Sequence, residues 1–296
     1  MRADIKKIEE MMEAADYVTD AAIGMSLYLA MTLKKPLLVE GHAGVGKTEM
    51  AKVMAQMLGT NLIRLQCYEG LDAAQALYEW NYPKQLLHIK LEEGTAHSIE
   101  EKETAIFSPP FLIKRPLLQA ISATEIPPVL LIDEIDRADE EFEAFLLEIL
   151  SEFQITIPEI GTVKATNPPY VILTSNRIRE LSDALRRRCL YLWIDYPSFE
   201  KEIRIVTRKV PGINERLARE ISRFMEVART IRLAKAPGVA ETLDWAQALC
   251  SFHADHLDLN LINETLACVV KDADDIKRLK RELANSGIDR FISAVG

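Results

Sequence analysis

A glycine-rich segment near the N-terminus carries the strongest chemical signal in the sequence. Residues 41–48 read GHAGVGKT and match the pattern GxxxxGK[ST] without a mismatch. Consecutive backbone N–H groups in such a loop, with the start of the following helix, form a nest for the β- and γ-phosphates of a nucleotide. Lys47 would bridge phosphate oxygens, and the Thr48 hydroxyl would ligate Mg²⁺. The predicted binding segment comprises Gly41, His42, Ala43, Gly44, Val45, Gly46, Lys47, Thr48 and Glu49.

Two carboxylates follow a second apolar segment, in the stretch PPVLLIDEIDR. Asp133 would lie beside the phosphate loop and hold Mg²⁺ together with Thr48. Glu134 could orient the water that attacks the γ-phosphate, or accept its proton. The simpler alternative is that both carboxylates end the strand and are solvated. Asp136 and Arg137 come next, and we expect them at the surface.

An amide and a run of arginines follow two further apolar segments. YVILTSN ends at Asn176, whose side chain can both donate and accept a hydrogen bond and so could position water. The alternative is a turn residue that caps the following loop. Farther on, Arg186, Arg187 and Arg188 precede another strand, and a guanidinium there could stabilise charge on the γ-phosphoryl oxygens of a neighbouring subunit's nucleotide. A solvated basic helix end and a local nucleic-acid patch are the alternatives.

Five short apolar runs surround these residues and predict the sheet that positions them. They cover residues 36–40, 62–67, 129–133, 170–175 and 189–194. Continuous rather than alternating apolar runs are typical of parallel strands covered by helices on both faces. Helical patterns lie between the runs, and the clearest follows a predicted N-cap at Asp139. The sequence therefore predicts a three-layer α/β domain with a parallel five-stranded sheet.

The order of patterns along the chain predicts two domains. Residues 1–196 would form the α/β core, and residues 197–296, where only helical patterns occur, an all-helical domain. Within the core, residues 68–115 are too long for a simple connection and read as an insert, whereas 154–166 predict a β-hairpin. The N-terminal residues 4–33 predict one or two amphipathic helices, with a break at Gly24.

Composition excludes several classes of protein. The chain has 296 residues and a net charge of −9, which disfavours a protein dominated by contacts to nucleic-acid phosphates. Four dispersed cysteines form no CxxC pair, so we expect reduced thiols. The most apolar stretch, residues 21–33, is too short to span a membrane, and no signal-peptide core precedes it. We expect a cytoplasmic protein.

Together these residues resemble the AAA+ ATPase superfamily. Its Walker A motif corresponds to residues 41–48, Walker B to Asp133 and Glu134, sensor 1 to Asn176 and the arginine-finger region to residues 186–188. The insert and the hairpin are similar to those of the MoxR branch. Within that branch, CYEGLDAAQALYEWNYPKQLL resembles the CoxD group, which is associated with molybdenum hydroxylases such as carbon monoxide dehydrogenase.

The resemblance implies roles for single residues. Lys47 and Thr48 would bind ATP and Mg²⁺, and Glu134 would be the catalytic base. Arg188 is the first choice for the finger and Arg187 the second, because RRRC resembles the end of the finger motif in relatives. One position departs from the family: relatives often carry a sensor-2 arginine at the start of a lid helix. This chain has Ala240 and Glu241 there. Either Lys235 or a residue of a neighbouring subunit substitutes for the arginine, or the lid is only weakly coupled to the γ-phosphate.

The resemblance also implies an assembly and partners. It predicts a homo-oligomeric ring of six subunits that acts as a chaperone in the maturation of a client metalloenzyme, together with a protein that carries a von Willebrand A-type domain. One alternative is a nucleic-acid-dependent or restriction-type NTPase, which the acidic insert disfavours. Another is a slow nucleotide switch or scaffold, which the intact Glu134 and Asn176 disfavour.

Overall fold

The computed structural model describes residues 2–92, 98–123 and 125–293. Residues 93–97 of the predicted insert lie outside the described residues. By its contacts the described chain divides into two compact units. The first contains residues 2–8, 21–40, 51–92, 98–123 and 125–192, and the second contains residues 9–20, 41–50 and 193–293. The domain boundary at residue 196 stays a prediction.

The first unit is built on a five-stranded parallel sheet, as the sequence predicts. The strands are β1 (Leu37–Gly41), β2 (Leu62–Gln66), β5 (Val129–Asp133), β8 (Tyr170–Ser175) and β9 (Leu190–Ile194), in the order β2-β5-β8-β1-β9. In register, Glu40 pairs with Ser175, and Gln66 pairs with Asp133. The carboxyl ends of neighbouring strands therefore meet along one edge, where the predicted acidic and amide residues stand.

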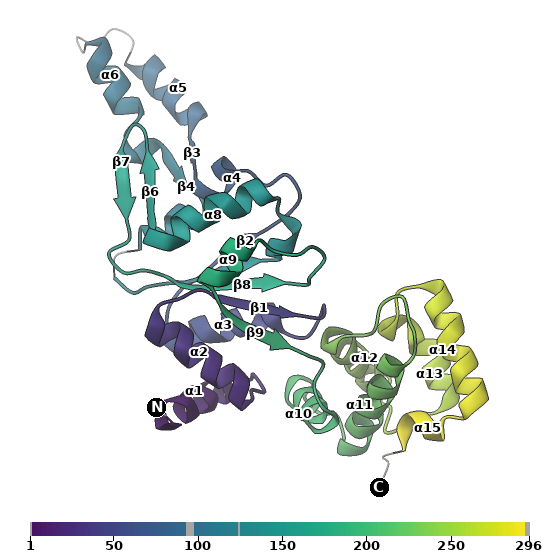
Figure 1. The fold of residues 1–296 in the computed structure, drawn as a ribbon. Helices are drawn as coiled ribbons and strands as arrows, with labels where there is room; N and C mark the ends of the chain where they lie inside the picture. The colour runs from purple at the N-terminus through teal and green to yellow at the C-terminus, as the bar shows by residue number, and fades with distance from the viewer. Residues whose placement is uncertain (1, 93–97, 124, 294–296) are drawn as a thin grey trace. The chain divides into compact units, whose positions relative to one another are not determined.

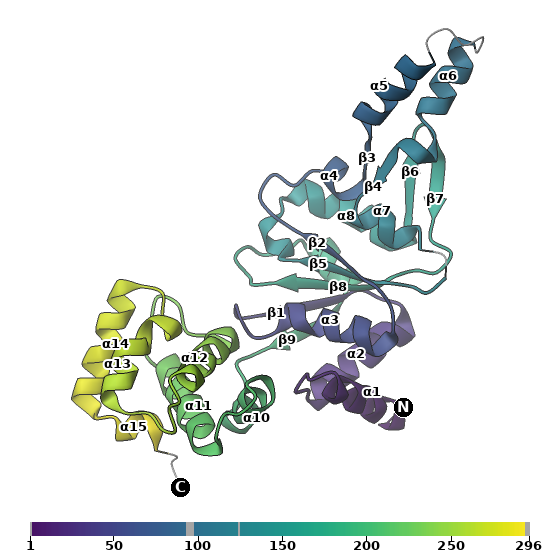
Figure 2. The ribbon, with the colours of Figure 1, turned by 180° about the vertical axis from the view of Figure 1, so that it is seen from behind.

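Helices cover both faces of this sheet. On one face, alternate strand residues such as Leu38, Leu130 and Leu173 pack in a core with α7 (Pro116–Ile121), α8 (Glu140–Glu152) and α9 (Asp183–Arg188). Residues one position away, such as Ile172, point to the other face. Ile172 lines a pocket there with residues of α2 (Ala21–Leu33) and α3 (Lys47–Leu58). Figures 1 and 2 show that α8 and α3 lie on opposite sides of the strands.

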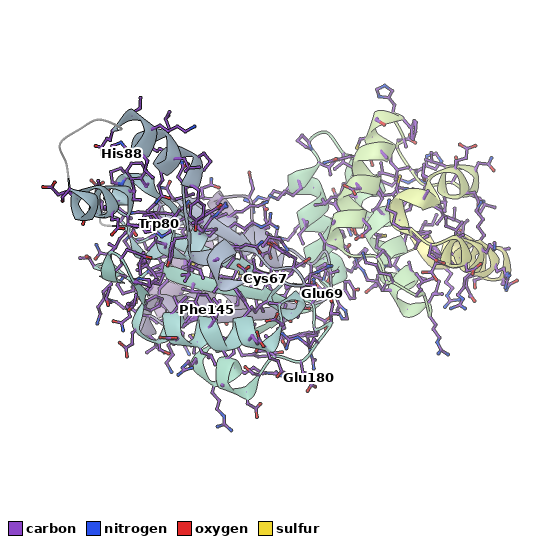
Figure 3. All side chains as sticks on the ribbon, turned by 90° about the horizontal axis from the view of Figure 1, so that it is seen from above. Cys67, Glu69, Trp80, His88, Phe145 and Glu180 are labelled. Atoms are coloured by element: carbon purple, nitrogen blue, oxygen red, sulfur yellow. The ribbon has the colours of Figure 1, made fainter. Side chains whose placement is uncertain are left out.

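The predicted insert and hairpin both form secondary structure. The insert contains α4 (Ala73–Leu77), β3 (Tyr78–Trp80), α5 (Tyr82–Leu91), α6 (Ile99–Ile106), a 3-10 turn (Pro109–Phe111) and β4 (Leu112–Lys114). Strands β3 and β4 pair antiparallel, and α5 and α6 extend beyond them (Figure 1). Trp80 and His88, both labelled in Figure 3, contact aromatic rings that come later in the insert. The hairpin comprises β6 (Gln154–Ile157) and β7 (Gly161–Lys164).

The break between the two N-terminal helices lies at other residues than the sequence predicts. Helix α1 covers Arg2–Ala14 and α2 covers Ala21–Leu33, so the break lies at residues 15–20 rather than at Gly24. Gly24 lies on the buried side of α2 with Ile23 and Leu27. A glycine costs about 1 kcal/mol inside a helix, and burial of this apolar helix offsets that cost.

The second unit has a helical core of its own. Its helices are α10 (Phe199–Lys209), α11 (Glu215–Thr230), α12 (Val239–Ser251), α13 (Leu259–Val269), α14 (Ala273–Ser286) and α15 (Asp289–Ile292). The rings of Phe224, Trp245 and Phe291 meet in its centre and are fully buried. From residue 199 onward the described residues contain helices but no strand, as the sequence predicts.

Candidate functional site

The phosphate loop follows β1, and its backbone requires glycine at defined positions. Gly44 and Gly46 have φ of +76° and +96°, a region that disfavours other residues. At Gly41 a Cβ atom would lie only 2.1 Å from the backbone oxygen of Ile194. Helix α3 begins at Lys47, so the N–H groups of its first turn come directly after the loop. Loop and helix start together form a cradle of backbone donors that suits phosphate.

Two side chains of the loop make defined contacts. Lys47 is buried, and its Nζ donates to the backbone oxygens of Gly41 and His42 at 2.7 and 2.6 Å. The ammonium thus lies inside the loop, where a bound phosphate would compete for it. His42 is exposed, and its ring stacks on Tyr196 with centroids 4.4 Å apart. The guanidinium of Arg229 lies over the same tyrosine, 4.7 Å from its centroid.

The start of α12, where the expected sensor-2 arginine is replaced by Ala240 and Glu241, packs against the phosphate loop. The Ala240 N–H donates to the oxygen of Gly44 at 3.1 Å. A Cβ atom at Gly238 would lie 2.6 Å from the oxygen of Ala43, so backbone meets backbone here. Glu241 caps its own helix through the Gly238 N–H, and Lys235 lies 3.7 Å from it. Lys235 is therefore engaged by Glu241.

At the sheet edge in the first unit, Asp133 ends β5 and is buried. Its Oδ1 accepts a hydrogen bond from the Thr174 hydroxyl at 2.5 Å, and its Oδ2 lies 2.5 Å from the guanidinium of Arg64 on β2. Cys67, labelled in Figure 3, donates its N–H to the oxygen of Asp133. Burial raises the pKa of the Cys67 thiol to about 12, with smaller contributions from neighbouring carboxylates including Glu134. This thiol is accordingly neutral.

Glu134 stands next to Asp133 in a left-handed conformation, with φ of 55°. Its N–H donates to the Thr174 hydroxyl at 2.9 Å. Its Oε1 accepts from the Asn176 side chain at 3.4 Å, while Oε2 lies 3.2 Å from Gln66 and 2.7 Å from Arg137. The structure thus brings the predicted pair Glu134 and Asn176 together, with the Glu134 carboxylate partly exposed.

The expectation that Asp136 lies at the surface is wrong. Its side chain is only 3% exposed, and its Oδ2 accepts the N–H groups of Asn176 and Ile178 at 3.0 and 2.9 Å. The carboxylate therefore fixes the backbone of the loop after β8, which carries Asn176. Arg137 is exposed, as expected.

The three consecutive arginines differ in their surroundings. All belong to α9, whose N-cap is Ser182. Arg186 is half-buried and lies 3.9 Å from the carboxylate of Glu40 on β1. Arg187 and Arg188 are exposed, so both are available to another molecule.

The donor sets fit the groups that the sequence predicts. The phosphate loop offers backbone N–H groups and the Lys47 ammonium, which suit a nucleoside triphosphate. A threonine hydroxyl and the Asp133 carboxylate are oxygen ligands of the kind that Mg²⁺ prefers. The two carboxylate oxygens of Asp133 contact Thr174 and Arg64, which hold the carboxylate at the end of β5.

Three residues at the sheet edge were not predicted from the sequence. Gln66 contacts Glu134, and the reasoning that selected Asn176, a polar residue at the end of an apolar strand, would also have found it. Thr174 lies inside an apolar strand, and Arg64 inside another, so neither gave a signal.

Comparisons with known proteins agree with this geometry. A family model described as AAA domain (dynein-related subfamily) matches residues 36–189, more than half of the chain. The denitrification regulatory protein NirQ of Pseudomonas aeruginosa is 26% identical over 207 residues, which are 70% of this chain and 72% of that protein. Protein NorQ of Paracoccus denitrificans is 24% identical over 260 residues, 84% of this chain and 83% of that protein.

Solved structures show the same fold. A putative ATPase from Cytophaga hutchinsonii matches with a TM-score of 0.50 and 16% identity, covering 100% of this chain and 95% of that one. A mutant of Thermotoga maritima RuvB matches with a TM-score of 0.51 and 18% identity, covering 95% and 77%. Among the described residues, no helix has both the length and the apolar character needed to cross a membrane. By its family match and its relatives, the chain belongs to the dynein-related subfamily of AAA domains and is a nucleotide-binding AAA+ ATPase of MoxR-like type.

Proposed function

We propose that the chain hydrolyses Mg-ATP at the subunit interfaces of a homo-oligomeric ring and uses the energy to remodel a client protein. The observation that carries this proposal is the Glu134 carboxylate, which Asn176, Gln66 and Arg137 hold at the end of β5. A carboxylate at this position favours water as the nucleophile, since a phosphotransferase would need an acceptor site instead.

Each residue has a distinct task in the proposed reaction. Lys47 and the loop N–H groups bind the phosphates of ATP, and Thr48 and Asp133 would hold Mg²⁺, which neutralises phosphate charge when bound. Glu134 accepts the proton of the attacking water, and Asn176 orients the Glu134 carboxylate.

The finger comes from α9 of a neighbouring subunit. We assign it to Arg188, with Arg187 as the second candidate, because both side chains are exposed while Arg186 lies near Glu40 in its own chain. A guanidinium supplied in trans stabilises charge on the γ-phosphoryl oxygens in the transition state. The ring would have six subunits, by resemblance to MoxR-type proteins.

The insert supports a protein client rather than a nucleic acid. Helix α5 exposes Leu86, Leu87 and Leu91 to 61%, 58% and 73%, and a protein client could cover these apolar side chains. Nucleic-acid binding would instead need a basic surface, and the chain carries a net charge of −9.

The client we propose is a metalloenzyme whose metal centre is assembled with help from this chain. The CoxD-like stretch in the insert supports a molybdenum hydroxylase such as carbon monoxide dehydrogenase. The relative NirQ is described as a denitrification regulatory protein, which supports an accessory role of this kind. A protein with a von Willebrand A-type domain would act as the second partner.

ATPase activity of the purified chain, measured over a wide range of protein concentration, tests the enzymatic part. Turnover per subunit should rise steeply with concentration as rings form. Glu134→Gln should lower turnover by about 10²- to 10⁴-fold and Arg188→Ala by about 10³-fold. Arg219→Ala, at an exposed arginine on α11, is the matched control and should keep full activity. Turnover independent of concentration, with Arg188→Ala unaffected, would contradict a finger in trans.

The client is tested in the native cells. Without this chain, the molybdenum hydroxylase polypeptide should accumulate normally but lack activity and its complete metal centre. The Glu134→Gln variant should fail to restore that activity. Restoration by Glu134→Gln would show that hydrolysis is not required and would favour the scaffold alternative.

A further inference from the structure

Glu40 is a buried carboxylate directly before the first glycine of the phosphate loop. It is only 2% exposed, although it lies near the end of β1 where the strand gives way to the loop. A buried carboxylate is costly unless it is paired and hydrogen-bonded. Its partners therefore indicate what this position does.

Three side chains surround one oxygen of Glu40. The Tyr191 hydroxyl on β9 donates to Oε2 at 3.0 Å. Arg177 and Arg186 place guanidinium nitrogens 3.7 and 3.9 Å from the same oxygen, and Arg186 also lies over the Tyr191 ring. Both arginines are partly exposed, so the carboxylate faces inward and its two cations face outward.

The two arginines belong to segments that carry proposed catalytic groups. Arg177 directly follows Asn176 and has a left-handed backbone, with φ of 57°. Arg186 is the first of the three arginines of α9, and the other two, Arg187 and Arg188, are exposed. One carboxylate therefore ties the loop after β8 and the last turn of α9 to the end of β1.

We propose that Glu40 is a positioning residue that retains Arg186 within its own subunit, and thereby fixes α9 so that Arg187 and Arg188 face outward to the neighbouring nucleotide. The inference rests on the proposed function, since it concerns the finger in trans. Arg186 cannot leave without removing one of the two cations that offset a buried charge. Helix α9 has only six residues, so an anchored side chain in its last turn sets the direction of the next two.

The inference assigns Glu40 to the side of the subunit interface that supplies the arginines, not to the side that binds ATP. Rings that mix two variants test this assignment. Glu40→Gln should lower turnover at least about 10-fold, because it removes the charge that pairs with Arg177 and Arg186, with the KM for ATP within about 2-fold. Its own nucleotide site should remain intact. The Glu134→Gln variant has intact arginines but an inactive site of its own. A mixture of Glu40→Gln and Glu134→Gln should therefore have an ATPase activity well above the sum of the activities of the two variants measured alone.

The control mixture pairs Glu134→Gln with the double variant Arg187→Ala/Arg188→Ala. If this control regains activity and the Glu40→Gln mixture does not, Glu40 acts on its own site and the inference is overturned, while the proposed function stands. If the control mixture stays inactive although ring formation is verified by light scattering, no arginine acts in trans, and the proposed function and the inference both fail.

Arg186→Gln removes the other member of the Glu40–Arg186 ion pair, which is partly exposed. This variant replaces Glu40→Gln in the test if Glu40→Gln does not fold. It should slow turnover to a similar degree, and the double variant Glu40→Gln/Arg186→Gln should be no slower than either single one. Full turnover by Arg186→Gln would contradict the inference.

Tyr191→Phe is the matched control for the hydrogen bond. It removes only the hydroxyl that donates to the Glu40 carboxylate and leaves both ion pairs, so Arg186 should stay in place and turnover should stay within about 3-fold. If Tyr191→Phe is as slow as Glu40→Gln, the hydrogen bond matters rather than the pairing with arginine, and the inference is wrong.

Discussion

The Asn176 side chain donates to the Glu134 carboxylate, with Nδ2 and Oε1 3.4 Å apart. The two residues are 42 positions apart in the sequence and meet because β5 and β8 are neighbouring parallel strands. Asp136 accepts the Asn176 N–H and so fixes the backbone from which this amide projects. The contact therefore depends on the loop as well as on the sheet.

Asn176→Ala should lower ATP turnover by about 10- to 100-fold with little change in the KM for ATP. The reason is that a hydrogen bond to a charged group contributes about 1.5–3 kcal/mol, here to the orientation of Glu134. Steady-state phosphate release measures both constants. A change confined to KM would mean that Asn176 contacts bound nucleotide rather than Glu134.

Arg64→Gln should lower the Mg²⁺ concentration needed for half-maximal ATPase activity by a few-fold. The Arg64 guanidinium lies 2.5 Å from Oδ2 of Asp133, a proposed ligand of Mg²⁺, and its positive charge opposes a second cation there. The side chain is half exposed, so water and salt limit the effect.

The matched control for Arg64→Gln is Arg115→Gln, because Arg115 pairs with Glu79 in the insert at similar exposure. This control should leave the Mg²⁺ titration unchanged. A higher Mg²⁺ requirement in Arg64→Gln would instead show that the arginine holds Asp133 in a ligating orientation.

The sheet and the acidic edge could be predicted because their signals are local. Five continuous apolar runs predicted the five strands, and the parallel arrangement then placed Asp133, Glu134 and Asn176 along one edge. Asp139 was predicted as an N-cap from its position before an apolar stripe, and its side chain accepts the N–H of Phe142. Each of these features depends on a few neighbouring residues.

Other features depend on contacts between distant segments and gave no sequence signal. Asp136 is buried because two N–H groups about forty positions later need an acceptor, and this need cannot be read from DEIDR. Glu40 was read as the end of a strand, because its partners Arg177 and Tyr191 come far later in the chain. At Gly24, a local glycine suggested a break that burial of the helix overrides.

Cys189 should react slowly with alkylating reagents in the folded protein. Burial raises the pKa of its thiol from 9.0 to about 12, and the thiolate is the reactive form. At pH 8 the thiolate fraction, and with it the rate, should be about 10³-fold lower than in the urea-unfolded chain. Mass spectrometry of alkylated peptides measures this rate, and equal rates in folded and unfolded chains would contradict it.

The same shift makes the free energy of unfolding depend on pH. Because the thiol has the higher pKa in the folded state, its contribution to stability is fully present below pH 9.0 and is lost as pH rises toward 12. Cys189→Ala should therefore flatten the decline in stability at alkaline pH, as measured by urea unfolding. An unchanged decline would show that other groups cause it.

Glu202→Gln should lower the stability of the helical unit by about 3–5 kcal/mol, because it leaves a buried arginine unpaired. Glu202 is fully buried, and its carboxylate holds the guanidinium of Arg229 through both oxygens, at 2.5 and 2.7 Å. Thr242 on α12 donates to the same carboxylate at 2.7 Å, so the Glu202 carboxylate on α10 contacts both α11 and α12. Chemical unfolding followed by circular dichroism measures the change.

Glu215→Gln is the matched control for this prediction. It removes an exposed ion pair with Arg219 on α11, which contributes about 0.5 kcal/mol or less. Because Arg229 also lies over Tyr196, on which His42 of the phosphate loop stacks, Glu202→Gln should in addition weaken nucleotide binding, whereas Glu215→Gln should not. If both variants lose the same small amount of stability, Arg229 finds water once its partner is removed, and the pair is not the buried anchor that its geometry indicates.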